Sequence, residues 1–82
     1  MSGINYPRLS LLGDKVKAGQ ASKAETDEFM LMLYQNGRIS ENQYQLYING
    51  LNKKATDEVV NAALAVGAIL LIGYLLKEMF SK

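Results

Sequence analysis

The sequence predicts an all-α fold, in which a two-helix hairpin is followed by a long hydrophobic C-terminal helix and preceded by an extended N-terminal arm. Capping patterns that begin at Ser22 and Ser40 mark two helix starts. Residues 59–76 carry no charge, whereas residues 1–20 show no sustained helical or strand period. We therefore divide the chain into an arm, a hairpin and a C-terminal transmembrane helix with a short tail, at residues 1–20, 21–55 and 56–82.

The composition excludes most catalytic chemistry. The 82 residues include no cysteine and no histidine, so the chain lacks thiolate ligands, the commonest metal ligand and the commonest general base. It also lacks a glycine-rich phosphate loop, a nucleophile elbow and a calcium loop. With nine basic and eight acidic residues, it has no charge excess that would attract nucleic acid. We expect no enzyme activity, cofactor, metal, nucleic acid or small-molecule substrate.

The N-terminal arm combines Pro7 and three glycines with isolated apolar residues. The sequence favours an extended segment, with one short helix over residues 9–17 as an alternative. It has no continuous apolar core of the kind found in a secretory signal. The arm is either loosely ordered or docked on a partner, and the residues predicted to make that contact are Ile4, Tyr6, Leu9, Leu11 and Leu12.

The first helix of the hairpin begins with a capping box, because Glu25 follows Ser22 by three residues. Asp27 and Glu28 lie near the helix start, where the dipole favours negative charge. The helix is predicted to run through the apolar block of residues 29–34 to Asn36. Gly37 can adopt the left-handed conformation that ends helices.

The second helix repeats the pattern, with Gln43 three residues after Ser40. Its apolar residues recur at i, i+3, i+4 and i+7, which indicates an amphipathic helix with one packing seam. The short connection predicts that the two helices are antiparallel neighbours, with Ile39 under the turn. The residues expected to pack within the hairpin or to contact a partner are Phe29, Met32, Leu33, Ile39, Tyr44, Tyr47, Ile48 and Leu51.

Residues 29–51 resemble the SHOCT module, a short bacterial helical hairpin. The residues that match its pattern are the turn glycine Gly37, the buried turn residue Ile39, the cap Ser40, the following acid Glu41, the aromatic Tyr44 and the closing Leu51. The chain departs from the pattern at Arg38, at Gln43 where an acid is usual, and at Tyr47 where a lysine is common. The resemblance implies oligomerisation or partner binding without catalysis. A hairpin of this size buries too little surface to be stable alone.

The C-terminal helix is predicted to begin at Thr56, with Asp57 and Glu58 as its acidic first turn. A break around residues 52–56 would separate it from the hairpin, and fusion of the two helices into one is the alternative. The eighteen residues 59–76 would form a helix of about 27 Å, close to the thickness of the hydrocarbon core of a bilayer. They therefore predict a single membrane span.

Residues predicted to line this span are Val59, Val60, Leu64, Val66, Gly67, Ile69, Leu70, Leu71, Ile72, Tyr74, Leu75 and Leu76. Ala63 and Gly67 have the spacing that lets membrane helices approach closely. Tyr74 fits an interfacial position. The rival interpretation is a soluble protein in which this helix is the core of a homo-oligomer.

These features predict a small, tail-anchored membrane protein that acts as an anchor, adaptor or assembly component. Its partners would be the lipid bilayer and either a second protein or another copy of itself, with the N-terminus in the cytoplasm. A minor protein of a phage virion that links an internal membrane to the shell is one setting of this kind. A membrane-permeabilising oligomer of the holin or toxin type and a soluble helical homo-oligomer are the two alternatives.

Overall fold

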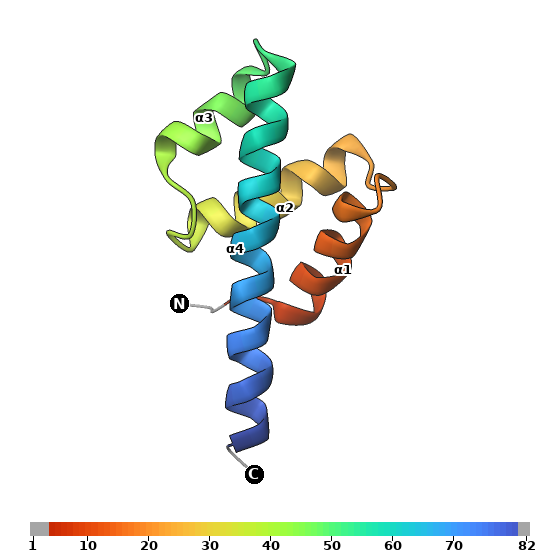
Figure 1. Ribbon diagram of the computed structural model, residues 1–82, viewed down its shortest axis with the longest axis vertical. Coiled ribbons are helices and arrows are strands. Elements are labelled where there is room, and N and C mark those ends of the chain that lie inside the picture. Colours follow the sequence, from red (N-terminus) through yellow and green to blue (C-terminus); the bar gives the residue numbers. More distant parts are fainter. Residues whose placement is uncertain (1–3, 81–82) are drawn as a thin grey trace.

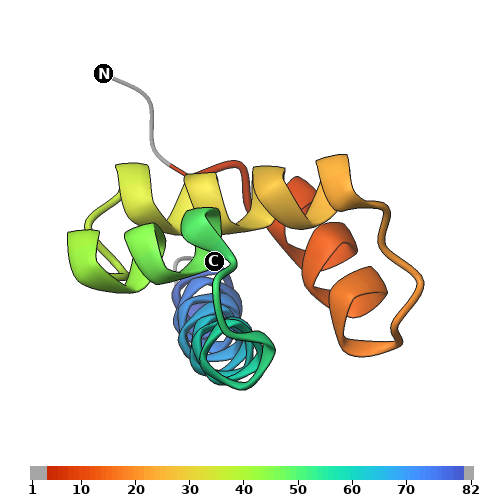
Figure 2. The ribbon, with the colours of Figure 1, turned by 90° about the horizontal axis from the view of Figure 1, so that it is seen from above.

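A computed structural model describes residues 4–80 of the chain. Its elements are α1 (Tyr6–Lys17), α2 (Lys23–Gln35), α3 (Glu41–Asn49) and α4 (Lys53–Phe80), and this part of the chain contains no strand. Helix α4 follows the longest axis of the molecule, and its C-terminal end projects beyond the other three helices (Figure 1). Seen from above, α1, α2 and α3 lie on one side of α4 (Figure 2). We call α1–α3 the three-helix layer. The prediction of an all-α fold with a long apolar C-terminal helix is confirmed.

The prediction of an extended N-terminal arm is wrong over residues 6–17, which form α1. The helix begins where the Asn5 side chain accepts a hydrogen bond from the backbone N–H of Arg8, at 3.1 Å. Pro7 lies in the first turn, where a missing N–H costs nothing. The alternative short helix over residues 9–17 falls within α1.

The residues predicted for contact of the arm with a partner instead serve this chain's own core. Leu9 and Leu12 are fully buried, and Ile4 and Tyr6 pack partly buried against the same cluster. Leu11 is half exposed. The residues of α1 that pack on the core include Leu9, Leu12 and Val16, which have helical spacing, but a helix this short is stabilised mainly by tertiary packing.

Both predicted capping boxes are present. The Ser22 hydroxyl accepts from the Glu25 N–H at 3.1 Å, and the Glu25 carboxylate accepts from the Ser22 N–H at 2.9 Å. Ser40 and Gln43 make the same reciprocal pair, at 3.0 and 2.8 Å. Helix α2 ends at Asn36 as predicted, and Gly37 follows it with φ of 69°. The starts of α2 and α3 each depend on two residues only three positions apart, so they can be predicted from the local sequence.

A break separates α3 from α4, so the fused-helix alternative is wrong. Gly50 ends α3 in the left-handed region, with φ of 58°, and α4 begins at Lys53. The predicted cap at Thr56 is also wrong, since Thr56 lies inside α4. The Asn52 carboxamide oxygen accepts from the Ala55 N–H at 3.2 Å instead. Asparagine is among the best capping residues, and it starts the helix one turn earlier.

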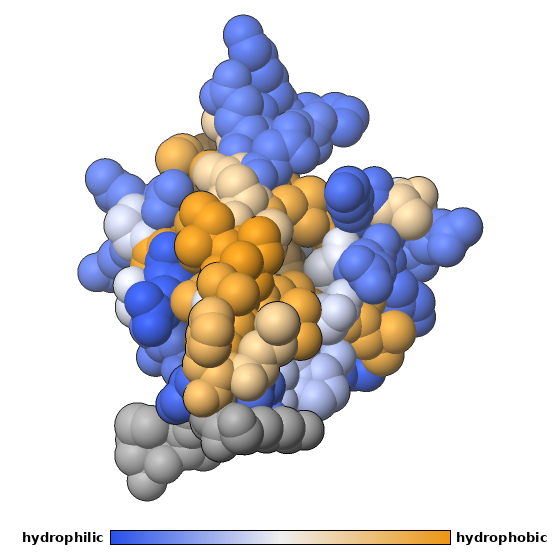
Figure 3. Space-filling view, turned by 60° about the horizontal axis from the view of Figure 1, so that its bottom comes forward, coloured by the Kyte–Doolittle hydropathy of each residue, from blue (hydrophilic) through white to orange (hydrophobic). Residues whose placement is uncertain are grey.

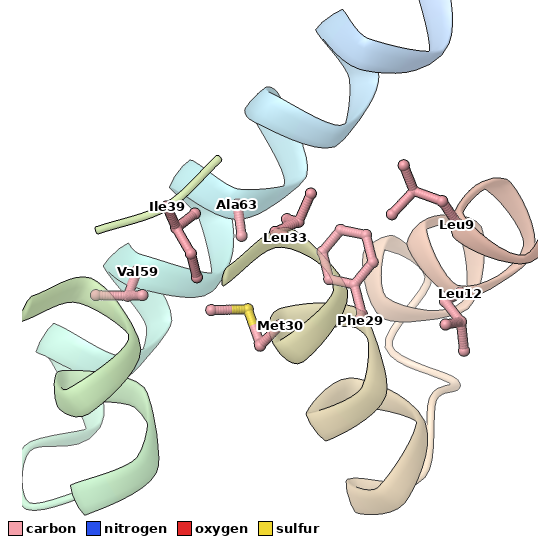
Figure 4. Packing of buried hydrophobic residues seen from close by; sticks show 8 residues of the cluster. All are labelled: Leu9, Leu12, Phe29, Met30, Leu33, Ile39, Val59 and Ala63. Carbon is pink, nitrogen blue, oxygen red and sulfur yellow. The ribbon is translucent and has the colours of Figure 1, made fainter. Parts of the chain in front are cut away.

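Among residues 4–80, eight buried side chains form the core, and every helix except α3 contributes to it (Figure 4). They are Leu9 and Leu12 of α1, Phe29, Met30 and Leu33 of α2, Ile39 of the turn, and Val59 and Ala63 of α4. Phe29, Leu33 and Ile39 are therefore buried as predicted. Met30, Val59 and Ala63 also belong to the core, although the sequence placed Val59 in the span and pointed to Ala63 only for the close approach of another membrane helix.

Helix α3 departs from its predicted packing seam. Tyr44 and Tyr47 are partly buried against the core, as is Met32 of α2, but Ile48 is 53% exposed and Leu51 is 91% exposed. The left-handed Gly50 ends the helix, so the heptad spacing no longer places Leu51 on the seam. Leu51 does not pack within this chain and Ile48 is only half covered by it, and the role of both residues as partner contacts stays a prediction.

The ring of Phe29 fills a narrow space between two glycines on different helices. A Cβ at Gly13 of α1 would lie 3.5 Å from Phe29 Cε1, and one at Gly67 of α4 would lie 3.3 Å from Phe29 Cζ. A Cβ at Gly73 would meet nothing within 4 Å. Gly67 thus lets α4 lie close to the three-helix layer of its own chain. Its spacing from Ala63 had suggested a close approach to a second membrane helix instead.

We expect Gly67→Leu to destabilise the fold by about 1–3 kcal/mol, because the added side chain would be forced against Phe29. The matched change Gly73→Leu should instead stabilise α4 by up to about 1 kcal/mol, since an exposed helical glycine carries only its propensity penalty. Urea unfolding followed by circular dichroism measures both. Equal effects of the two substitutions would contradict the close contact.

Candidate functional site

The surface of α4 divides into two faces. The inner face packs on the three-helix layer through Val59, Ala63 and Gly67, which are buried and spaced four residues apart. On the opposite side Ile69, Ile72 and Leu76 are 69%, 57% and 47% exposed. At 3.6 residues per turn these residues lie roughly half a turn away from the inner face. The chain therefore covers one side of its hydrophobic helix and leaves the other uncovered.

We define the outer face of α4 by the exposed apolar residues of its last five turns. Two charged residues in this stretch, Lys77 and Glu78, project at other angles around the helix. In the space-filling view, apolar side chains gather along α4 with hydrophilic surface on both sides (Figure 3). The residues of the outer face are Ala65, Ala68, Ile69, Ile72, Leu75, Leu76, Met79 and Phe80.

Among the described residues, α4 is the one helix long and apolar enough to cross a membrane. Only 17% of its eighteen-residue hydrophobic window is buried, whereas the core helix of a water-soluble domain is mostly buried. The predicted span residues fall into three groups. Val59 and Gly67 are buried; Val60, Leu64, Val66, Leu70, Leu71 and Tyr74 are partly buried; Ile69, Ile72, Leu75 and Leu76 are exposed.

Helix α1 lies beside most of the predicted span. The ring of Tyr6, at its start, stacks on Tyr74 with centroids 4.3 Å apart and planes 11° from parallel. Lys17, at its end, lines the same groove as Asn61 of α4, a cavity of about 490 Å³ between the two helices. This contact covers the fourteen-residue stretch of α4 from Asn61 to Tyr74, about 20 Å.

The position of α1 bears directly on membrane insertion. If residues 59–76 crossed a bilayer with α1 still in place, Arg8 and Asp14 would lie at the depth of the hydrocarbon. A charged residue at the centre of a membrane helix costs about 2.5–3.5 kcal/mol on the insertion scale. The closed arrangement therefore disfavours a full span of the bilayer by residues 59–76.

Polar interactions join the three helices of the layer to one another. The Arg8 guanidinium of α1 donates to both carboxylate oxygens of Glu28 of α2, at 2.8 and 2.7 Å, and Lys15 pairs with Glu25. Bidentate geometry of this kind fixes the orientation of the two helices.

Helices α2 and α3 are linked in two ways. The Tyr47 hydroxyl donates a hydrogen bond to Asp27, and the rings of Tyr34 and Tyr44 stack with centroids 4.4 Å apart and planes 7° from parallel. The layer is thus held together by both polar and aromatic contacts. The contacts described above between the layer and α4 are apolar.

The ion pairs and hydrogen bonds within the layer shift the pKa values of three carboxyl groups and one tyrosine. The ammonium group of Lys15, followed by the Ser22 N–H, lowers the pKa of Glu25 to about 2. Hydrogen bonds from Lys23 and then Tyr47 lower the pKa of Asp27, and the Arg8 guanidinium lowers the pKa of Glu28. Burial, followed by the hydrogen bond to Asp27, raises the pKa of Tyr47.

Acid should therefore loosen the layer. Because the pKa of Glu25 is lower in the folded chain than in the unfolded one, its contribution is complete above about pH 4.5 and is lost as the pH falls towards 2. We expect the urea concentration at the unfolding midpoint to decrease over this pH range. In Glu25→Gln this decrease should be smaller, and the midpoint at pH 7 should be lower than in the parent. An unchanged acid profile in that variant would contradict this assignment.

Comparison with family models, curated proteins and solved structures found no match to this chain. The resemblance of residues 29–51 to the SHOCT module therefore stays a prediction. The outer face of α4 was visible in the sequence only as part of an apolar stretch. Which side of α4 is exposed became evident only once the three-helix layer was placed against it.

Proposed function

We propose that this protein is a membrane-anchored adaptor or assembly component, in which α4 inserts into lipid and the three-helix layer contacts a protein partner. One observation carries the proposal: α4 has an eighteen-residue hydrophobic window of which only 17% is buried. Leaving so much apolar surface in water is unfavourable, and a bilayer removes that cost without needing a shaped partner.

The adaptor part of the proposal is supported by the surface of the three-helix layer. Several large apolar side chains there remain at least one third exposed, on all three helices and the segment after α3. They are Leu11, Leu31, Leu46, Ile48 and Leu51. Covering exposed apolar side chains with another protein removes them from water, which favours binding.

Carbonate extraction of membranes from cells that express the full chain tests the anchor. We expect the protein to remain in the pellet, and purification to require detergent. Size-exclusion chromatography with and without detergent provides a second readout. A protein that is fully extracted by carbonate and monodisperse in plain buffer would overturn the proposal.

A second candidate is a homo-oligomer, which the spacing of the outer face favours. Ile69, Ile72, Leu76 and Met79 follow one another by three, four and three residues, the heptad pattern of helix pairs. In this case the outer face of α4 would meet the same face of another copy. Sedimentation equilibrium in buffer without detergent distinguishes the two candidates, since only self-association through α4 gives a defined soluble oligomer.

A further inference from the structure

We propose that the three-helix layer swings away from α4 as one unit when α4 inserts into a bilayer, and that the arrangement in Figure 1 is the closed form outside lipid. The inference rests on the proposed membrane anchoring. It follows from the position of α1, which runs beside α4 from Asn61 to Tyr74 and would otherwise carry charged residues into the hydrocarbon.

The connection between α3 and α4 supplies the hinge. Residues 50–52 lie between the two helices, and they are all exposed. Gly50 adopts a left-handed conformation, and Leu51 is 91% exposed, so the side chain of Leu51 does not fix this segment against either helix. Because the hinge is the only covalent link between the layer and α4, a change of its backbone angles moves the whole layer.

The contacts within the layer differ in kind from those between the layer and α4, and this difference explains why the layer would move as a unit. Arg8–Glu28, Lys15–Glu25 and Tyr47–Asp27 hold its helices together, and lipid cannot replace these polar links. The contacts with α4 described here are apolar, including the Tyr6–Tyr74 stack and the approach of Phe29 to Gly67. Acyl chains can replace apolar contacts of this kind around α4.

Two stacked tyrosine pairs provide a matched test, because the chain has no cysteine of its own. In Tyr6→Cys/Tyr74→Cys, a short bismaleimide would join α1 to α4 and lock the closed form. In Tyr34→Cys/Tyr44→Cys, the same reagent would join α2 to α3 and leave α4 free. The two ring pairs have centroid distances of 4.3 and 4.4 Å, so the two cross-links demand nearly the same reach.

Each variant is linked in solution, mixed with phosphatidylcholine liposomes and extracted with carbonate. We expect the α1–α4 link to reduce the inserted fraction at least tenfold, while the α2–α3 link and both unlinked variants insert like the parent. Circular dichroism before mixing checks that all forms are equally helical.

The outcomes separate the two proposals. Equal insertion of the chain locked between α1 and α4 would overturn the opening of the layer but leave membrane anchoring intact. If both cross-linked forms failed to insert while the unlinked variants inserted, the proposal would also be overturned, because a layer linked only between α2 and α3 should still move away from α4. Failure of the parent and of every variant to insert would overturn the membrane anchor itself.

Discussion

Replacing Phe29 by alanine is expected to destabilise the closed form by about 3–5 kcal/mol, because the ring is 1% exposed and fills the space between α1 and α4. The total stability expected for a domain of this size is about 4–12 kcal/mol, so one substitution would remove a large part of it. The loss should be large because the two glycines that flank the ring have no side chains to fill the cavity.

Urea unfolding in dilute buffer, followed by circular dichroism, measures the effect. Leu31→Ala is the matched control, since Leu31 lies on the same helix but is 37% exposed. We expect the control to change stability by no more than about 1 kcal/mol. If the two variants unfolded at the same urea concentration, the ring of Phe29 would not be the centre of the packing between α1 and α4.

Replacing Ile69 by arginine should abolish membrane insertion without disturbing the closed form. Ile69 lies near the middle of residues 59–76 and is 69% exposed, so the arginine would remain in water when the layer is closed. In the bilayer it would lie near the midplane, where it costs about 3–4 kcal/mol relative to isoleucine. The membrane-bound fraction should therefore fall a few hundredfold at equilibrium.

Flotation with liposomes and carbonate extraction measure this loss, and urea unfolding checks the fold. Leu51→Arg introduces the same charge at an exposed aliphatic residue outside α4, and it should insert like the parent. Retention of Ile69→Arg in the carbonate-resistant pellet would contradict the span. Loss of insertion in both variants would point to a general effect of added positive charge.

Local signals in the sequence predicted both ends of α2 and the start of α3. The capping boxes at Ser22 and Ser40 and the stop at Gly37 each depend on groups a few residues apart, so the tertiary structure did not have to supply them. The start of α4 was misplaced because Asn52 and Thr56 are both capable caps, and the one used lies nearer to Gly50.

The long-range arrangement was not accessible in the same way. Leu9 and Leu12 looked like isolated apolar residues of an arm, but they form one core with the buried residues of α2 and α4, which lie at least seventeen positions away in the sequence. Gly67 looked like a contact point for a second membrane helix, whereas it accommodates the ring of Phe29 from the same chain.

Neighbouring residues in the sequence were enough to predict that this protein is helical, that α2 and α3 begin after their caps Ser22 and Ser40, and that the uncharged residues 59–76 are long enough to span a bilayer. The covered side of α4 and the position of α1 along it became evident only from the packing of distant segments. The reason is physical: helix caps and hydrophobicity are properties of neighbouring residues, whereas burial depends on which distant side chains meet.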